Sequence, residues 1–254
     1  YKAKALGRYR SAFFTDDLTV DHISRLTLIA QMRQGLERNE FEIHYQPQVS
    51  LQTLKLIGAE ALVRWQHPER GLIPPMDFIP LAEETGFIEA LGEWVLFEAC
   101  RQLKLWQVEG DADFTMAVNL SVKQILYGDV VSVVRDVLEK TGLEGRFLEL
   151  EITESSLMGD AAQIMVTLES LKSLGVKIAI DDFGTGYSSL SYLKRFPVDK
   201  LKIDRSFIMD IPEDKQDVAI SKAILALGKS MEMRVIAEGV ETEQQLNFLS
   251  SHHC

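Results

Sequence analysis

The sequence is poor in cysteine, since only Cys100 and Cys254 occur in 254 residues. Two cysteines build no disulfide framework, and such low usage is typical of reducing compartments. No run approaches the about 18 apolar residues of a membrane-spanning helix, and no secretory leader is evident. The chain begins at Tyr1 rather than Met. We therefore expect a piece of a longer protein that works in the cytoplasm, either freely or as the cytoplasmic part of a membrane-anchored protein.

Positive charge is also scarce. Lysine and arginine number 27 against 38 aspartates and glutamates, which gives a net charge of −11. A general nucleic-acid binder usually presents a basic face, so DNA is not expected as a partner. A small anionic ligand is compatible with this balance if metal ions supply positive charge. The hydrophobic content of 46% is ordinary for a globular domain with a sizeable core.

Apolar, strand-like runs alternate with helical patterns, which is typical of βαβ units and a mainly parallel sheet. The runs that we expect to be strands are 41–49, 56–65, 114–122, 147–155, 176–184, 199–207 and 234–240. Helical spacing occurs over 78–109, 127–141, 161–174, 188–195 and 217–229. The connection at 50–55 is short, so the first two strands should form an antiparallel hairpin.

The strand count favours a barrel. Seven strands in 254 residues come close to the eight strands and about 250 residues of a TIM barrel. An open doubly wound sheet is the alternative, but its first βα turn should be glycine-rich, and no such turn occurs here. We therefore predict an α/β fold, a modified TIM (β/α)8 barrel with an antiparallel first strand, and with the last strand missing or lying beyond Cys254.

Polar side chains gather near the C-terminal ends of six expected strands. They are Glu60, Asn119, Glu151, Asp181, Asp182, Lys202, Asp204 and Glu238. Period-two alternation places Leu148 and Leu150 on one face of their strand and Glu149 and Glu151 on the other. In a barrel the apolar face packs under helices and the polar face points inward. Barrel active sites are built at this end of the strands.

Converging carboxylates require a cation or raised pKa values, because they repel one another. Carboxylate and amide oxygens are ligands that Mg²⁺, Mn²⁺ and Ca²⁺ prefer, and no histidine or cysteine cluster indicates zinc. The pair Asp181–Asp182 could bridge two ions, a device for phosphodiester displacement. An enolase-type barrel with a lysine base and one main ion is the alternative. Alone, Asn119 is explained by a turn or cap, and Lys202 by an ion pair.

Eight sequence motifs occur in one characteristic order. They are YQPQV (45–49), EALVRW (60–65), HPERGLIPPMDFIPLAEETGFI (67–88), NLS (119–121), ELEITES (149–155), DDFGTGYSSLSYLK (181–194), KIDRSFI (202–208) and AEGVET (237–242). The chain resembles the EAL domain, a cyclic di-GMP phosphodiesterase family that EALVRW names. The resemblance runs from about Leu26 to Cys254, and so many motifs at family spacing are highly specific.

The resemblance implies a fold and an activity. The fold is a modified TIM barrel whose first strand is antiparallel. The activity is hydrolysis of cyclic di-GMP to linear pGpG by a water that two Mg²⁺ or Mn²⁺ ions activate, in bacterial second-messenger signalling. A homodimer is implied as well. Degenerate members bind the dinucleotide without cleaving it, so a receptor or partner-binding module is the alternative function.

The resemblance also implies roles for individual residues. One ion would be held by Glu60, Asn119, Glu151 and Asp181, and the other by Asp181, Asp182 and Glu238. The residues implied to act in catalysis are Glu60, Lys202, Asp204 and Glu154, of which Glu154 supports the loop after Asp182. Within that loop, metal binding and dimerisation involve Phe183, Gly184, Thr185 and Gly186. The dinucleotide would contact Gln46, Leu62 and Arg64.

The segment before the barrel resembles part of another domain. Residues 1–15 resemble the tail of a GGDEF diguanylate cyclase domain, and a basic helical leader is the alternative. Residues 16–25 look like a helical linker, and 26–254 form the EAL domain. This organisation implies upstream GGDEF and sensory domains in the full protein. The family continues with a strand carrying QGY and a helix, which would follow Cys254.

Overall fold

The structure is a computed structural model that describes residues 16–110, 114–158, 160–186, 193–252 and 254. The chain divides into two compact units. The larger comprises Ile43–Arg64 and Ile88–Cys254, and the smaller comprises Trp65–Phe87 and the chain up to Glu42. Within the described part, no helix combines the length and the apolar character that a membrane crossing requires.

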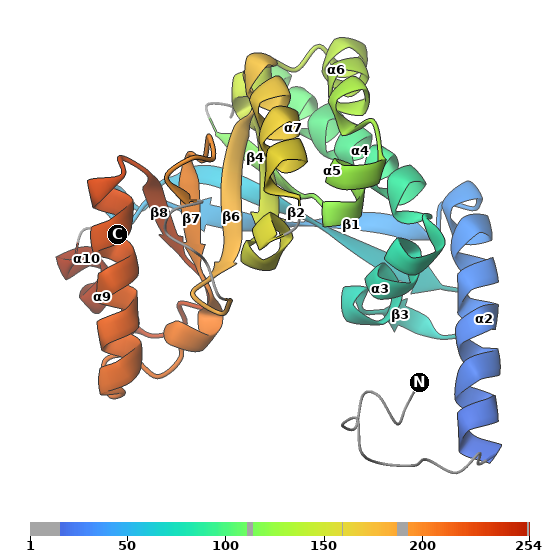
Figure 1. Ribbon diagram of the computed structural model, residues 1–254, viewed down its shortest axis with the longest axis horizontal. Coiled ribbons are helices and arrows are strands. Elements are labelled where there is room, and N and C mark those ends of the chain that lie inside the picture. Colours follow the sequence, from blue (N-terminus) through green and yellow to red (C-terminus); the bar gives the residue numbers. More distant parts are fainter. Residues whose placement is uncertain (1–15, 111–113, 159, 187–192, 253) are drawn as a thin grey trace. The chain divides into compact units, whose positions relative to one another are not determined.

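The larger unit is built on one sheet (Figure 1). Its strands are β1 (Phe41–Val49), β2 (Leu56–His67), β4 (Thr115–Asn119), β5 (Leu148–Thr153), β6 (Lys177–Phe183), β7 (Lys200–Ile203) and β8 (Arg234–Ala237). They are hydrogen-bonded in the order β1-β2-β4-β5-β6-β7-β8. Each pairing from β2 to β8 is parallel. The strands expected from sequence are all present, with ends that differ by a few residues.

Strands β1 and β2 form a hairpin. The backbone N–H of Ser50 donates to the carbonyl of Lys55 at 2.9 Å and closes the turn between them. So short a connection cannot carry a parallel crossover, and the pair is therefore antiparallel. A curled, mixed sheet with an antiparallel first strand confirms the predicted variant of the TIM barrel. Among the described residues no strand joins β8 back to β1, so the sheet is open there.

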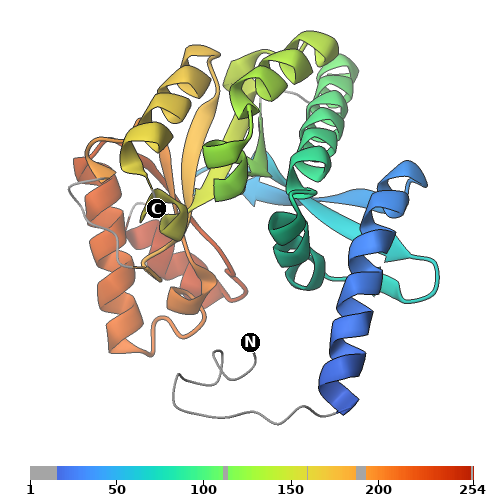
Figure 2. The ribbon, with the colours of Figure 1, turned by 45° about the vertical axis from the view of Figure 1, so that its right-hand side comes forward.

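Helices cover the outer face of this sheet, as Figure 2 shows. They are α4 (Ile88–Glu109), α5 (Val122–Tyr127), α6 (Val130–Thr141), α7 (Ala161–Ser173), α9 (Lys215–Ser230) and α10 (Glu243–Ser251). Short 3₁₀ turns are η1 (Gly145–Phe147), η2 (Glu154–Met158) and η3 (Arg205–Phe207). Beneath the helices, Leu148, Leu150, Ile178 and Leu201 are fully buried. The apolar face of the strands therefore packs outward, as their period-two alternation predicts.

Two predicted helices are wrong in their bounds. The range 78–109 divides into α3 (Pro75–Thr85) and α4, because Gly86 adopts a left-handed φ of 76° that ends α3. In the range 127–141, Tyr127 is the last residue of α5, and the next helix, α6, begins only at Val130 with Asp129 as its N-cap. Helix α10 was not expected at all. The range 188–195 lies largely outside the described residues.

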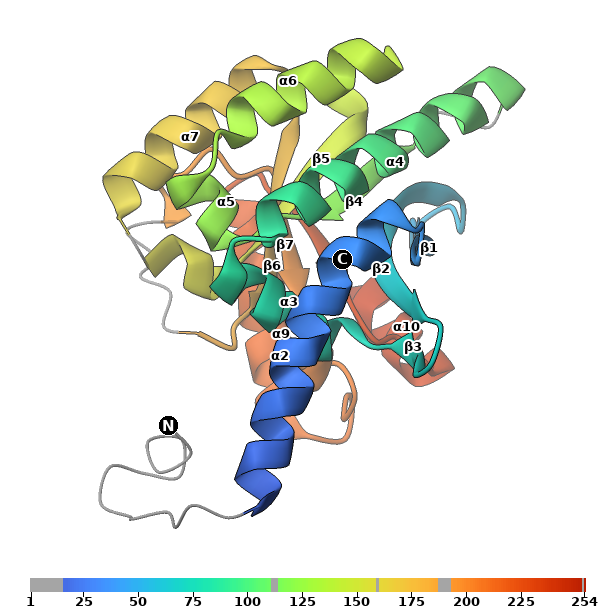
Figure 3. The same cartoon turned by 90° about the vertical axis from the view of Figure 1, so that its right-hand side faces the viewer.

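The smaller unit is held by aromatic packing. It contains α2 (Asp16–Glu37), α3, the outer ends of β1 and β2, and β3 (Gly71–Ile73), which pairs antiparallel with β2 (Figure 3). Phe41 stacks on Trp65 at 5.2 Å between ring centroids, and Phe78 meets both rings edge-on. Helix α2 runs on through the boundary expected between residues 25 and 26, and the domain boundaries stay a prediction.

Candidate functional site

The inner face of the sheet carries an acidic cluster around one buried lysine. The Nζ of Lys202, on β7, lies 3.0 Å from Glu60 Oε2 and 2.6 Å from Glu151 Oε2. It also lies 3.1 Å from Asp181 Oδ1 and 2.7 Å from Glu238 Oε1. These side chains come from β2, β5, β6 and the residue after β8. Parallel strands thus bring acidic groups that are distant in sequence to one end of the sheet.

Two groups of carboxylates have the spacing of metal ligands. One consists of Glu60, Glu151 and Asp181, and the other of Asp181, Asp182 and Glu238. In each group the ligand atoms all lie within 4.8 Å of one another. Asp181 belongs to both groups. Asn119 joins the first group indirectly, because its Nδ2 donates to Glu60 Oε1 at 2.7 Å and leaves the amide oxygen as its ligand atom.

The charges of this cluster fit metal ions. Four carboxylates face one ammonium, whose three N–H groups cannot satisfy them all. One oxygen, Glu151 Oε1, is buried without a hydrogen-bond partner within the described part of the chain. An unpaired buried carboxylate oxygen is costly, whereas a divalent cation would supply both a ligand bond and positive charge. Hard oxygen donors of this kind suit Mg²⁺, Mn²⁺ or Ca²⁺.

The acid–base properties of the cluster reflect its excess negative charge. Burial is the main cause that raises the pKa of Glu151, and the neighbouring Glu60 and Asp181 raise it further. Burial also raises the pKa of Asp182 and of Glu238. For Lys202, burial alone would lower the pKa, but the surrounding carboxylates raise it well above the usual value. Burial and mutual repulsion thus favour the protonated forms of these carboxyl groups, and a bound cation would favour the ionised forms.

A backbone irregularity brings Asp181 and Asp182 to the same cluster. Neighbours in a regular strand point to opposite faces. Here the pairing of β6 with β7 shifts register between Ile180 and Phe183, and Asp182 has a left-handed φ of 54°. Its backbone N–H donates to Asp181 Oδ1 at 2.9 Å. Aspartate tolerates this conformation better than most residues, and such backbone strain is concentrated at functional sites.

Glu154 contacts the loop after β6. Its Oε2 accepts hydrogen bonds from the N–H groups of Gly184 at 2.7 Å and Gly186 at 3.3 Å. Thr185 Oγ1 donates to the Asp182 carbonyl at 2.8 Å, and Phe183 is buried. A Cβ on Gly186 would lie 2.9 Å from Glu154 Oε1, so the close approach needs glycine. The rest of this loop, 187–192, lies outside the described residues.

Asp204 lies at the edge of the cluster. Its Oδ1 accepts hydrogen bonds from the backbone N–H and the hydroxyl of Ser206, and so caps η3. Burial by itself would raise the pKa of Asp204, but these hydrogen bonds hold it below the usual value. The side chain also shares a hydrogen bond with Asp182. Among the described ion pairs of Lys202, Asp204 is not a partner.

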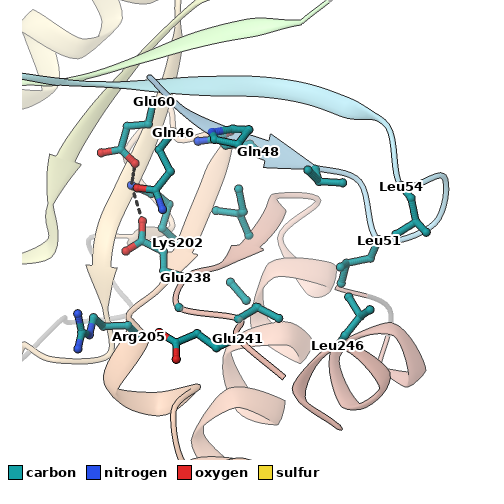
Figure 4. Close-up of a pocket in the computed structure, with 16 residues that line it drawn as sticks. Gln46, Gln48, Leu51, Leu54, Glu60, Lys202, Arg205, Glu238, Glu241 and Leu246 are labelled. Carbon is teal, nitrogen blue, oxygen red and sulfur yellow. Dashed lines mark hydrogen bonds and ion pairs between the residues drawn. The ribbon is translucent and has the colours of Figure 1, made fainter. Parts of the chain in front are cut away.

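A cavity of about 590 Å³ adjoins the acidic cluster. In Figure 4, Gln46 from β1 lies beside Glu60, and dashed lines mark the ion pairs of Lys202 with Glu60 and Glu238. Leu62 and Arg64 follow Glu60 on the same face of β2 but do not line this cavity, and Arg64 Nη1 donates to the neighbouring carbonyl of Val63. The volume of this cavity suits a ligand that is larger than a metal ion alone.

The cavity also has lining residues that the sequence analysis did not single out. They are Gln48, Arg205 and Glu241, with apolar neighbours such as Leu51, Leu54 and Leu246. Arg205 and Glu241 lie within the motifs KIDRSFI and AEGVET, and Gln48 lies within YQPQV. Their positions beside the expected site residues were a signal that could have found them.

The chain is similar to known bacterial signalling proteins. Over all of its 254 residues it is 50% identical to the bifunctional diguanylate cyclase/cyclic di-GMP phosphodiesterase MucR of Pseudomonas aeruginosa, of which it covers 37%. It is 46% identical to the cyclic di-GMP phosphodiesterase NbdA of the same organism over 100% of the chain and 32% of that protein. The chain thus spans about a third of the length of these curated relatives.

A solved structure and a family pattern also match this chain. A solved structure of the PaMucR phosphodiesterase in complex with c-di-GMP superposes with a TM-score of 0.86 and 52% identity. The match covers 90% of this chain and 92% of that one. The pattern of the EAL domain matches residues 29–254. Because this match takes in both carboxylate groups and the cavity beside them, the chain belongs to the EAL domain family.

Proposed function

We propose that this chain hydrolyses cyclic di-GMP to linear pGpG with two Mg²⁺ or Mn²⁺ ions at the acidic cluster. The relatives MucR and NbdA carry cyclic di-GMP phosphodiesterase in their names, and the PaMucR structure is a c-di-GMP complex. The single observation that carries the proposal is the pair of carboxylate groups that share Asp181. A shared carboxylate between two ligand groups is the arrangement that a two-metal phosphodiesterase requires.

The residues that would hold the ions are the six that the resemblance to the EAL domain implies. They are Glu60, Asn119, Glu151, Asp181, Asp182 and Glu238. Bound Mg²⁺ or Mn²⁺ supplies a water of lowered pKa and offsets negative charge on the phosphate. The unpartnered oxygen of Glu151 supports this assignment, because a carboxylate buried for structure alone would have all of its oxygens satisfied.

Lys202 would act as a charged donor at this site. In hydrolysis, water adds to one phosphorus, the bond from phosphorus to the 3′ oxygen breaks, and that oxygen takes up a proton. In the metal-free protein the carboxylates around Lys202 raise its pKa. As an ammonium, Lys202 would stabilise negative charge on the phosphate rather than act as a base. Glu154 would act indirectly, by holding the loop at Gly184 and Gly186.

The dinucleotide would occupy the cavity beside the cluster. Gln46 lines that cavity together with Glu60 and Lys202. Leu62 and Arg64 do not line the cavity, so they would contact a part of the ligand that extends beyond it along the same face of β2. A homodimer, with loop residues Phe183 to Gly186 involved, and a GGDEF domain upstream are further parts of the proposal. Light scattering of the purified chain tests the dimer. The cytoplasmic location of the protein stays a prediction.

The decisive experiment follows turnover and binding together. The purified chain is incubated with cyclic di-GMP and Mn²⁺, and pGpG is measured by chromatography with and without EDTA. We expect pGpG only with metal, and at least a hundredfold loss in Glu60→Gln, which keeps the size of the side chain. The exposed Glu139→Gln on α6 is the matched control. Tight binding of cyclic di-GMP without formation of pGpG would refute the proposed phosphodiesterase activity and support the function of a cyclic di-GMP receptor.

A further inference from the structure

A second buried charged group lies one layer below the acidic cluster. Glu149 precedes Glu151 on the inner face of β5, and Lys200 precedes Lys202 on the inner face of β7. The Nζ of Lys200 lies 2.5 Å from Glu149 Oε1 and 3.4 Å from Gln48 Oε1. We call Glu149, Lys200 and Gln48 the lower layer. It repeats the glutamate–lysine pair of the site two residues earlier on the same strands.

The lower layer is tightly enclosed. The side chains of Lys200 and Glu149 are 9% and 1% exposed, and Gln48 is buried. A Cβ on Gly58 of β2 would lie 2.8 Å from Gln48 Oε1, so a larger residue there would displace the amide. Gln48 lines the cavity at the site, whereas Lys200 lines a second cavity of about 570 Å³. The layer therefore forms a floor beneath the acidic cluster.

The lower layer joins strands that are not neighbours in the sheet. β6 separates β5 from β7, and β1 lies at the far end of the hydrogen-bonded order. β1 pairs with β2 alone among the described strands. The contact from Lys200 to Gln48 ties β1 to β7 across the interior. Gln46, the next inner-face residue of β1, lines the cavity at the site.

Stability alone does not explain a buried ion pair at this position. Barrel interiors are usually filled by branched apolar side chains. Replacing a buried ion pair with apolar residues of similar size is often neutral or stabilising, because desolvation offsets the attraction. What the pair of Glu149 and Lys200 adds is direction: a short charge-assisted hydrogen bond sets the distance and rotation of two strands.

We propose that the lower layer is a positioning device for the site. Glu149 and Lys200 hold β5 and β7 so that Glu151 and Lys202 meet in the geometry that the metal ions need. Gln48 holds β1 so that Gln46 faces the same cavity. None of the three touches a metal ion or the phosphate that reacts. The inference rests on the proposed function, since it names what supports that site.

The test removes both charges at once, because removal of one leaves the other buried and unpaired. The double variant Glu149→Leu/Lys200→Met should fold with a melting temperature near that of the parent. We expect Mn²⁺ affinity, measured by calorimetry, to fall about 10- to 100-fold, as for residues that orient metal ligands. Turnover of cyclic di-GMP should show a lower kcat. The variant Gln48→Met should instead raise KM more than it lowers kcat.

Two controls separate positioning from general stability. Leu150→Val lies between Glu149 and Glu151 but on the apolar face, so it weakens the packing of β5 without touching the lower layer. It should leave Mn²⁺ affinity unchanged. The reversed pair Glu149→Lys/Lys200→Glu keeps a tie between the strands, and we expect it to recover part of the lost affinity.

The inference is overturned if the double variant binds Mn²⁺ within twofold of the parent. It is also overturned if Leu150→Val loses as much affinity as the double variant does. Because calorimetry with Mn²⁺ needs no turnover, a parent that makes no pGpG would refute the proposed function and still leave the positioning role decided by the metal titration.

Discussion

The acidic cluster and the lower layer use the same two strands and the same pair of residue types. In the lower layer one lysine, Lys200, faces one glutamate, Glu149, with a glutamine beside them. In the cluster one lysine, Lys202, faces four carboxylates. The ion pair of the lower layer matches one positive with one negative charge, and Lys177 adds a second cation that interacts with Glu149. The cluster instead keeps an excess of negative charge and, in Glu151 Oε1, a buried oxygen without a partner in the described structure.

Residue type alone therefore does not distinguish a structural ion pair from a metal site. The number of charged neighbours does. An ion pair of opposite charges needs no further cation, whereas a cluster with excess negative charge must take up either protons or metal ions. The difference arises from β2, β6 and the residue after β8, which bring Glu60, Asp181, Asp182 and Glu238 to the acidic cluster but add no carboxylate to the lower layer.

The largest effect is expected where the two carboxylate groups meet. Asp181→Asn removes the one charge that both groups share, and we expect pGpG formation to fall about a thousandfold or more. Glu149→Gln in the lower layer should cost much less activity, because that residue acts through others. Initial rates at saturating Mn²⁺ measure both. Equal losses of activity in the two variants would contradict the different roles of the acidic cluster and the lower layer.

Mn²⁺ should stabilise the protein against loss of Lys202 but not against loss of Lys200. Lys200→Met leaves Glu149 buried and unpaired, which destabilises the protein by about 3–5 kcal/mol whether or not Mn²⁺ is present. Lys202→Met also destabilises the metal-free protein, but Mn²⁺ should restore most of the loss by replacing the missing positive charge. Urea denaturation with and without Mn²⁺ compares them. If Mn²⁺ rescued Lys200→Met as well, the lower layer would be a metal site too.

The smallest effect is expected from pH. Glu151 has an ordinary pKa of 4.5 that burial raises in the folded protein. Above pH 4.5 the unfolded chain has lost this proton while the folded chain keeps it, so metal-free stability falls as pH rises toward the raised pKa. Mn²⁺ binds the ionised form, so its affinity should rise over the same window. Calorimetry in two buffers of different ionisation enthalpy detects the proton release, and proton-neutral binding would contradict it.

Local sequence patterns predicted the strands of the sheet and the polar side chains that gather on its inner face. Alternation with period two identified the inner face of β5 and β7, because backbone geometry alone sends successive side chains to opposite faces. Polar residues at the ends of six expected strands indicated where they would meet, because parallel strands end at the same edge. The hairpin of β1 and β2 followed from the length of its connection. Helix ends were less predictable, since the break at Gly86 depends on one left-handed residue.

Tertiary structure alone decided which charges balance. No local pattern shows that Lys200 meets one glutamate while Lys202, two residues later, meets four carboxylates, because the partners come from strands far apart in sequence. The shift of β6 that turns Asp182 toward Asp181 is likewise set by pairing with β7. Periodicity is a property of the backbone and can be read along the chain, whereas charge balance is a sum over neighbours and exists only once the sheet has curled.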